Sequence, residues 1–293
     1  MLVYKRTYTW TTGGLLVLPA ILVFTLFFVI PLLHVLLTSL HNYSQTSGVG
    51  DRWTTQNYAK FLRDPYYLGV LWRTIRISLV TTVVTLILGY PLAMVLAATK
   101  GRTRSWLILF LLAPLLVSMV IRAYGWVILL GTQGPVANLF HVLGLRTPTM
   151  LYTEFAIDLG MVHVFLAYMV LPILGSLENV DAAIVRAAAN LGAGKWYTFR
   201  RVLLPLTLPG VSAGAVMVFS LTASSFVTPS ILGGPRVPVM SELAYDQVVS
   251  VMNWPYGSAI GCILIVVTML LLLIYAGVLR GRRGRTEGTV TSW

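Results

Sequence analysis

Val185-Arg186-Ala187-Ala188-Ala189-Asn190-Leu191-Gly192 decides the fold, because this stretch is a polar, alanine-rich island between two long apolar segments. Nine residues later it is followed by Val202-Leu203-Leu204-Pro205, where the next apolar segment begins. Alanine is the strongest helix former, Asp181 is suited to cap a helix that starts after it, and Gly192 can adopt the left-handed conformation that ends one. The sequence therefore predicts a short helix over residues 182–191 between two membrane spans.

Six segments of the chain are long and apolar enough to cross a bilayer, which takes about 20 apolar residues in a helix. They cover roughly residues 14–40, 70–98, 105–130, 155–177, 202–232 and 256–279. The fifth is long enough to contain a broken or re-entrant portion. The chain is 57% hydrophobic and 10% charged, whereas soluble domains carry about 25% charged residues. We therefore expect an all-α integral membrane protein with six transmembrane helices.

The basic residues indicate how the spans are oriented, because Lys and Arg are enriched in cytoplasmic loops. With the N-terminus inside, thirteen of the 21 basic residues lie in four short inner segments, at residues 5–6, 100–104, 186–201 and 280–285. This placement predicts that both termini and the 182–191 helix are cytoplasmic. It also explains the net charge of +12 without a nucleic-acid partner. The first apolar segment is too long for a cleaved signal peptide, so we expect it to remain as a span.

The opening stretch resembles the cytoplasmic signature loop of binding-protein-dependent ABC importer permeases. That pattern runs Glu-Ala-Ala, three residues, Gly, nine residues, Ile, any residue, Leu-Pro. The positions that match in register are Ala187, Ala188, Gly192, Leu204 and Pro205. Arg186 stands where the family has Glu, and Val202 where it has Ile. The resemblance implies a type I ABC importer permease fold, with one permease domain over residues 1–293, a core at about 70–280 and a coupling loop at about 178–201.

In that family the loop carries a coupling helix that docks in a groove of the ATPase. The resemblance therefore implies contact with an ABC ATPase homodimer, which binds ATP and Mg²⁺. The coupling residues that it implies are Asp181, Arg186, Ala187, Ala188, Gly192, Leu204 and Pro205. Arg186 would need a complementary acidic residue on the ATPase. No cofactor is expected on this chain, because its Gly192–Lys195 stretch lacks the first Gly and the Ser or Thr of a phosphate-binding loop.

Other segments resemble the polyamine-type permeases of this family, which take up spermidine, putrescine and related cations. They are Arg122-Ala-Tyr124-Gly-Trp126, Ser225-Phe226-Val227-Thr228-Pro229, Leu232-Gly233-Gly234-Pro235-Arg236 and Asn253-Trp254-Pro255. The resemblance implies a bacterial inner-membrane permease, surrounded by lipid, that moves a small cationic solute by alternating access. It also implies a solute-binding protein and a second, different permease subunit.

The acidic residues of the fourth span fit a cationic solute. Glu154 and Asp158 are four residues apart, so a helix places them on one face, and an acid inside a membrane is costly unless a cation or water relieves it. Our candidates for the substrate path are Asp158, Glu154, Arg122, Tyr124, Trp126, Ser225 and Phe226. The alternatives are that Glu154 is only interfacial, that Asp158 pairs with Arg122 or another helix, and that the aromatic residues are interface anchors.

Other functions remain as alternatives. The solute could be an opine, an amino-acid derivative or another small molecule; Arg73, Arg76 and Arg122 would then be the better candidates if it were anionic. An ion-coupled secondary transporter predicts acids deep in the membrane, and Asp158 alone meets that expectation. No enzymatic or metal site is expected, because the scattered histidines lack acidic partners at ligand spacing.

Overall fold

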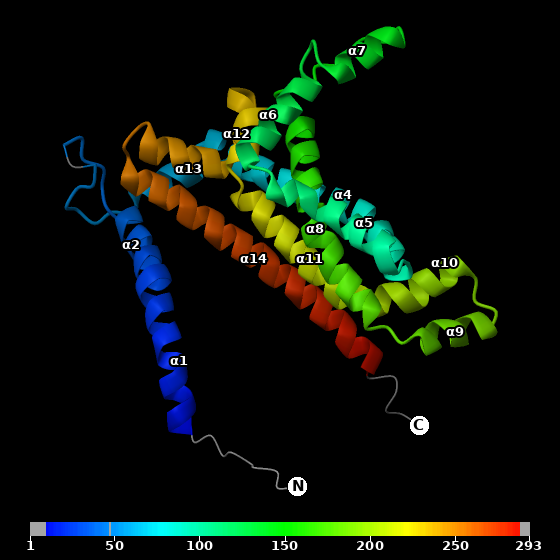
Figure 1. Ribbon diagram of the computed structural model, residues 1–293. Helices are drawn as coiled ribbons and strands as arrows, with labels where there is room; N and C mark the ends of the chain where they lie inside the picture. Colours follow the sequence, from blue (N-terminus) through cyan, green and yellow to red (C-terminus); the bar gives the residue numbers. More distant parts are fainter. Residues whose placement is uncertain (1–9, 47, 288–293) are drawn as a thin grey trace. The chain divides into compact units, whose positions relative to one another are not determined.

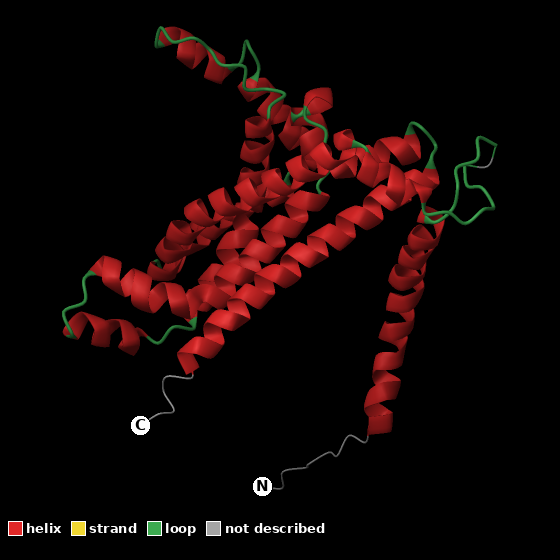
Figure 2. Ribbon diagram, turned by 180° about the vertical axis from the view of Figure 1, so that it is seen from behind, coloured by secondary structure: helices red, strands yellow, loops and turns green. Residues whose placement is uncertain are grey.

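The computed structural model describes residues 10–46 and 48–287 of the chain. Within these residues the chain consists of helices joined by loops, and its one strand-like feature is an isolated antiparallel bridge between His41 and Trp53 (Figure 2). Contacts divide the chain into two compact units. The first holds the described residues up to Arg63 together with Ala244–Ile263, and the second holds Asp64–Leu243 with the described residues from Leu264 onward.

The first unit contains a long apolar helical run. α1 (Trp10–Phe24), the π-helical turn Thr25–Val29 and α2 (Ile30–Ser39) follow one another without a break, and Val17–Ser39 is apolar enough to span a membrane. The polar helix α3 (Gln56–Arg63) is tied to the end of α2, because the hydroxyls of Tyr58 and Ser39 share a hydrogen bond of 2.6 Å. The first predicted span is therefore confirmed as a long apolar helix.

The second unit is built around three long helices, α4 (Pro65–Ala98), α8 (Glu154–Glu178) and α11 (Leu204–Ser224), which pack against one another in pairs (Figure 1). The most deeply buried of the three is α8: 61% of its most apolar stretch is buried inside the protein, compared with 39% for α4. Its buried side chains face both neighbours, so the core of the unit lies along α8.

Two glycines of α11 allow this close packing. A Cβ atom at Gly210 would collide with the carbonyl oxygen of Pro172 in α8, and one at Gly214 would lie 2.8 Å from the sulfur of Met169. Small residues let helix backbones approach closely inside a membrane, where water does not drive helices together. The α8–α11 contact therefore depends on backbone proximity at these two positions.

The second unit also contains shorter helices. They are α5 (Gly101–Leu116), α6 (Met119–Leu130), α7 (Pro135–Val142), α9 (Ala182–Asn190), α10 (Lys195–Thr198), α12 (Val227–Leu232) and the 3-10 turn Gly234–Arg236. Two further helices, α13 (Met240–Val249) and the long α14 (Trp254–Glu287), have residues in both units.

The third predicted span, residues 105–130, differs from the expected straight helix. α5 ends at Leu116, α6 starts at Met119, and the helical pair Gly101–Leu116 and Met119–Val142 is bent by 97°. Pro114 removes a helical hydrogen bond near the end of α5, and Val117 is extended. The described residues thus contain five helices long and apolar enough to span a membrane, or six when the bent pair is one span.

The fifth predicted span, residues 202–232, contains the break that its length indicated. α11 ends at Ser224, Ser225 is extended, and the short α12 begins at Val227. At its other end the helical run starts earlier than expected, at Lys195, because α10 and the π-helical turn Phe199–Leu203 continue directly into α11. Pro205 therefore lies within a continuous helical run.

Candidate functional site

The predicted short helix after α8 is present as α9, and both of its predicted ends are confirmed. The Asp181 carboxylate accepts a hydrogen bond from the backbone N–H of Ala183 at 2.8 Å. Gly192 has φ +79°. The N–H groups of Gly192 and Ala193 donate to the carbonyls of Ala189 and Ala188, which is a Schellman motif. The local sequence thus determines where α9 begins and ends.

α9 projects at one end of the second unit, beside α10 (Figure 1). On its outward face the exposed residues are Ala183, Arg186, Ala187 and Asn190, which recur at helical spacing. Val185 and Ala188, on the opposite side, are partly covered. Large apolar side chains are exposed beside this helix: Leu191 is 87% exposed and Trp196 71%. This end of the molecule therefore presents small, apolar and basic side chains that the described chain does not cover.

The segment that carries α9 is anchored to the central helices on both sides. Before it, Glu178 at the end of α8 forms an ion pair with Arg104 of α5. After it, Phe199 packs edge-on against Tyr90 of α4, with 5.2 Å between ring centroids, and the Tyr90 hydroxyl bonds the hydroxyl of Thr207 at 2.8 Å. A displacement of α9 would therefore act on α5, α4 and α11.

The two remaining predicted coupling residues lie at the base of this segment. Leu204 is half-buried and packs against the core, whereas Pro205 is exposed. Neither lies on the outward face of α9. The geometry favours a supporting role for Leu204 and Pro205, with the exposed surface supplied by α9 itself.

At the opposite end of α8, Glu154 and Asp158 lie on one face of the helix, as their four-residue spacing predicted. That face is directed toward α4. Glu154 forms ion pairs with Arg76 and with Arg73, whose Nε lies 3.5 Å away. Asp158 accepts a hydrogen bond from the Thr81 hydroxyl at 2.8 Å. Its partner is thus another helix rather than Arg122. Neither acid lines the cavity at the two helix breaks or the apolar cavity between α4, α11 and α14, both of which are described below.

Arg122 holds the break between α5 and α6. Its guanidinium Nη1 donates to the carbonyl oxygens of Pro114 at 2.5 Å and Val117 at 3.2 Å. The last carbonyls of a helix have no partner within the helix. Arg122 therefore supplies donors to backbone groups that the end of α5 exposes.

A cavity of about 340 Å³ lies where the two helix breaks meet α8. It is lined by Leu115, Val117, Met119, Arg122, Val164, Phe165, Tyr168, Leu221, Ser224, Ser225, Phe226 and Val227. Three of the predicted path residues meet here: Arg122, Ser225 and Phe226. The candidates predicted from the sequence for the substrate path did not include Phe165 and Ser224. The sequence signal that could have indicated them is the pair of helix breaks, because helices inside a membrane are broken where they line a cavity. We call this space the break cavity.

The other predicted path residues lie elsewhere. Tyr124 is 57% exposed. Trp126 packs edge-on against His163 of α8, with 5.6 Å between ring centroids. Trp126 and His163 therefore help to hold α6 against α8 and do not line the break cavity.

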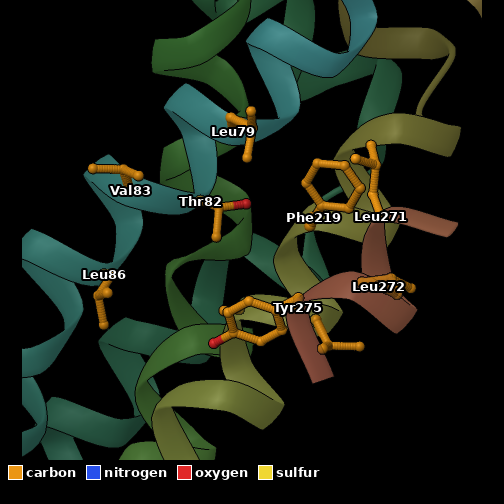
Figure 3. Close-up of a pocket in the computed structure, with 10 residues that line it drawn as sticks. Leu79, Thr82, Val83, Leu86, Phe219, Leu271, Leu272 and Tyr275 are labelled. Atoms are coloured by element: carbon orange, nitrogen blue, oxygen red, sulfur yellow. The ribbon is translucent and has the colours of Figure 1, made fainter. Parts of the chain in front are cut away.

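A second cavity, of about 270 Å³, lies between α4, α11 and α14 (Figure 3). Its lining is apolar except for Thr82 and Tyr275. The Thr82 hydroxyl already donates to the carbonyl of Ser78 at 2.6 Å. This cavity suits an alkyl chain rather than a charged solute, so the break cavity is the better candidate for a solute path.

Residues 79–284 match the family described as binding-protein-dependent transport system inner membrane component. The chain belongs to this family. The permease is 34% identical over 252 residues to "Spermidine/putrescine transport system permease protein PotB" of Salmonella typhimurium (strain SL1344), covering 85% of this chain and 88% of the relative. The protein of the same name from Escherichia coli (strain K12) is also 34% identical, with 85% and 91% covered.

Solved structures show the same fold. The permease superposes on a chain of a bacterial alginate ABC transporter, in complex with an alginate pentasaccharide-bound periplasmic protein, with a TM-score of 0.75. The sequence identity is 18%, and the match covers 90% of this chain and 92% of that chain. The predicted type I importer permease fold is thus confirmed, and the permease is a transport component rather than an enzyme.

Proposed function

We propose that the permease imports polyamines such as spermidine and putrescine, or related small amines, across the bacterial cytoplasmic membrane as a subunit of an ATP-driven transporter. The observation that carries this proposal is the 34% identity to a spermidine/putrescine permease over 85% of the chain. The chain then acts as a single permease domain, with both termini and α9 in the cytoplasm. A binding protein delivers the solute, and a second, different permease completes the membrane part.

In this proposal α9 docks on one subunit of an ATPase homodimer. Its outward face is small and exposed, which lets another protein approach the helix backbone. The ion pair between Glu178 and Arg104 and the contact of Tyr90 with Phe199 and Thr207 transmit movement of α9 to α5, α4 and α11. Nucleotide-driven closure of the ATPase dimer would in this way change the access of the solute path.

The break cavity is the proposed solute path. Phe165, Tyr168 and Phe226 offer aromatic faces, which attract organic cations, and Ser224 and Ser225 offer hydroxyl and carbonyl oxygens. Asp158 is a candidate for an earlier stage of the path, since on α8 it lies between the outer end of the helix and the cavity residues Phe165 and Tyr168.

One observation favours a second solute class. Arg122 is the single charged side chain among those that line the break cavity. An anionic or zwitterionic solute, such as an opine or an amino-acid derivative, would be attracted there, whereas a polyamine would be repelled. Import of such a solute by the same ATP-driven mechanism is therefore the alternative.

Transport by the reconstituted complex distinguishes the two solute classes. The complex of the permease, its partner permease and the ATPase is placed in liposomes, with the binding protein outside, and uptake of radiolabelled putrescine, spermidine and octopine is measured. We expect polyamine uptake that requires ATP and the binding protein. Uptake of octopine alone would select the second class, and uptake driven by an ion gradient without ATP would overturn the assignment.

A further inference from the structure

Arg186 places a positive charge on the outward face of α9, and docking through small side chains alone does not explain this charge. Its side chain lies on the outward face, beside Ala183, Ala187 and Asn190, all exposed. These neighbours are too short to cover a guanidinium, so the charge extends beyond the surface of the helix. Any protein that packs closely on α9 must accommodate this cation.

The described acids near α9 have other partners. Glu178 is paired with Arg104. Asp181 uses its carboxylate to cap the N–H of Ala183. Glu178 and Asp181 are the two acidic residues in the 178–201 segment. No ion pair among the described residues includes Arg186. The charge of Arg186 is therefore uncompensated within this segment.

The surroundings increase the need for an acidic partner. The same segment also carries Lys195, Arg200 and Arg201, so basic residues outnumber acidic ones by four to two. Burying an unpaired charge at an interface is strongly unfavourable, and a carboxylate offsets that cost when it accepts two parallel hydrogen bonds from the planar guanidinium. An uncharged or basic surface would bind α9 poorly.

We propose that the ATPase surface that receives α9 carries a carboxylate opposite Arg186, forming a bidentate ion pair that selects the cognate ATPase. This proposal rests on the proposed docking of α9 on an ATPase subunit. Arginine suits this pair better than lysine, because lysine keeps the charge but lacks the planar fork that forms two hydrogen bonds. The sign of the charge at position 186 also matters, since a carboxylate there would face the carboxylate of the ATPase and repel it.

The test uses the complete complex, captured through a tag on the permease, and measures how much ATPase is retained. We expect Arg186→Glu to lower retention at least about tenfold, Arg186→Ala less, and Arg186→Lys least, as expected for a lost interfacial pair. Arg102→Glu, a charge reversal at an exposed residue of α5 outside residues 178–201, is the matched control and should retain the ATPase. Gel filtration of each variant establishes that the permease is folded.

Reversal of the charge pair gives the decisive result. Acidic residues of the ATPase surface are changed one at a time to Lys and combined with Arg186→Glu; we expect one of them to restore retention and uptake to within about threefold of the wild type. Retention unchanged in Arg186→Glu would overturn the ion pair while leaving docking intact. Failure of the wild-type permease to retain any ATPase would instead overturn the proposed function.

Anionic lipid is the competing partner of this cation. If Arg186→Glu weakened binding of the permease to phosphatidylglycerol nanodiscs but left ATPase retention unchanged, the charge would serve the membrane surface and the proposal would be wrong. If no acidic residue of the ATPase rescued Arg186→Glu, while Arg186→Ala behaved like the wild type, the loss would reflect only the introduced carboxylate. That result would also contradict the proposal.

Discussion

The guanidinium of Arg122 donates a hydrogen bond to the carbonyl oxygen of Pro114, at 2.5 Å, across the break between α5 and α6. It reaches the carbonyl of Val117 as well, so one side chain bonds two backbone groups at the end of α5. The same side chain lines the break cavity. Arg122 thus connects the shape of a bent span with the lining of the proposed solute path.

Replacing Arg122 by Ala should therefore loosen the 97° bend. A hydrogen bond that involves a charged group contributes about 1.5–3 kcal/mol, so we expect a lower melting temperature in detergent and reduced uptake. Arg146→Ala is the control, because Arg146 is exposed and has no ion pair among the described residues. Equal melting temperatures for the two variants would show that Arg122 does not support the bend.

The hydrogen bond between Thr81 and Asp158 should contribute to stability because Thr81 is fully buried. Thr81→Val keeps the shape of the side chain but removes the donor to the carboxylate, and we expect a loss of about 1–3 kcal/mol. Thr82→Val is the matched control, since its hydroxyl bonds only the carbonyl of Ser78 in the same helix. Thermal unfolding of both variants distinguishes them; a Thr82→Val loss as large as that of Thr81→Val would contradict the role of Asp158.

Local sequence was sufficient to predict α9 and the apolar spans. Asp181 and Gly192 act on backbone groups within a few residues of themselves, so their capping roles are readable without tertiary structure. The apolar length of a span likewise follows from the thickness of the bilayer alone. The length of the fifth segment also indicated the break that occurs at Ser225.

The contacts of the site required the folded chain. Thr81 and Asp158 are 77 residues apart in sequence, and nothing near either residue indicates the other. At the bend of residues 117–118, Arg122 turns back and bonds the carbonyl of Pro114, a contact that a pattern of apolar residues does not predict. The break cavity escaped prediction for the same reason, because its lining comes from two separate helix breaks and from α8.

Gly192→Val should impair coupling without removing the permease from the membrane. Gly192 has φ +79°, a conformation that costs a β-branched residue more than about 1 kcal/mol, so the Schellman motif that ends α9 should unfold or shift. We expect ATPase retention and uptake to fall together. Gly194→Ala is the control, because Gly194 has φ −66° and open space around it. Full uptake by Gly192→Val would exclude a role of this turn in docking.

Tyr90→Phe should separate ATP hydrolysis from transport. The variant removes the hydroxyl that bonds Thr207 but keeps the ring that packs on Phe199. One neutral hydrogen bond contributes about 1 kcal/mol, so the permease should fold and retain the ATPase. We expect the number of solute molecules imported per ATP hydrolysed to fall in proteoliposomes, because α4 would follow the α9 segment less closely.

Tyr275→Phe is the control for this measurement, since Tyr275 also loses only a hydroxyl but lines the apolar cavity between α4, α11 and α14 (Figure 3). Its ratio of import to hydrolysis should equal that of the wild type. If Tyr90→Phe kept the wild-type ratio as well, the link between the α9 segment and α4 would have to run through ring packing alone. Tyr90→Leu, which removes the ring, would then lower the ratio, and an unchanged ratio in that variant would eliminate Tyr90 from coupling.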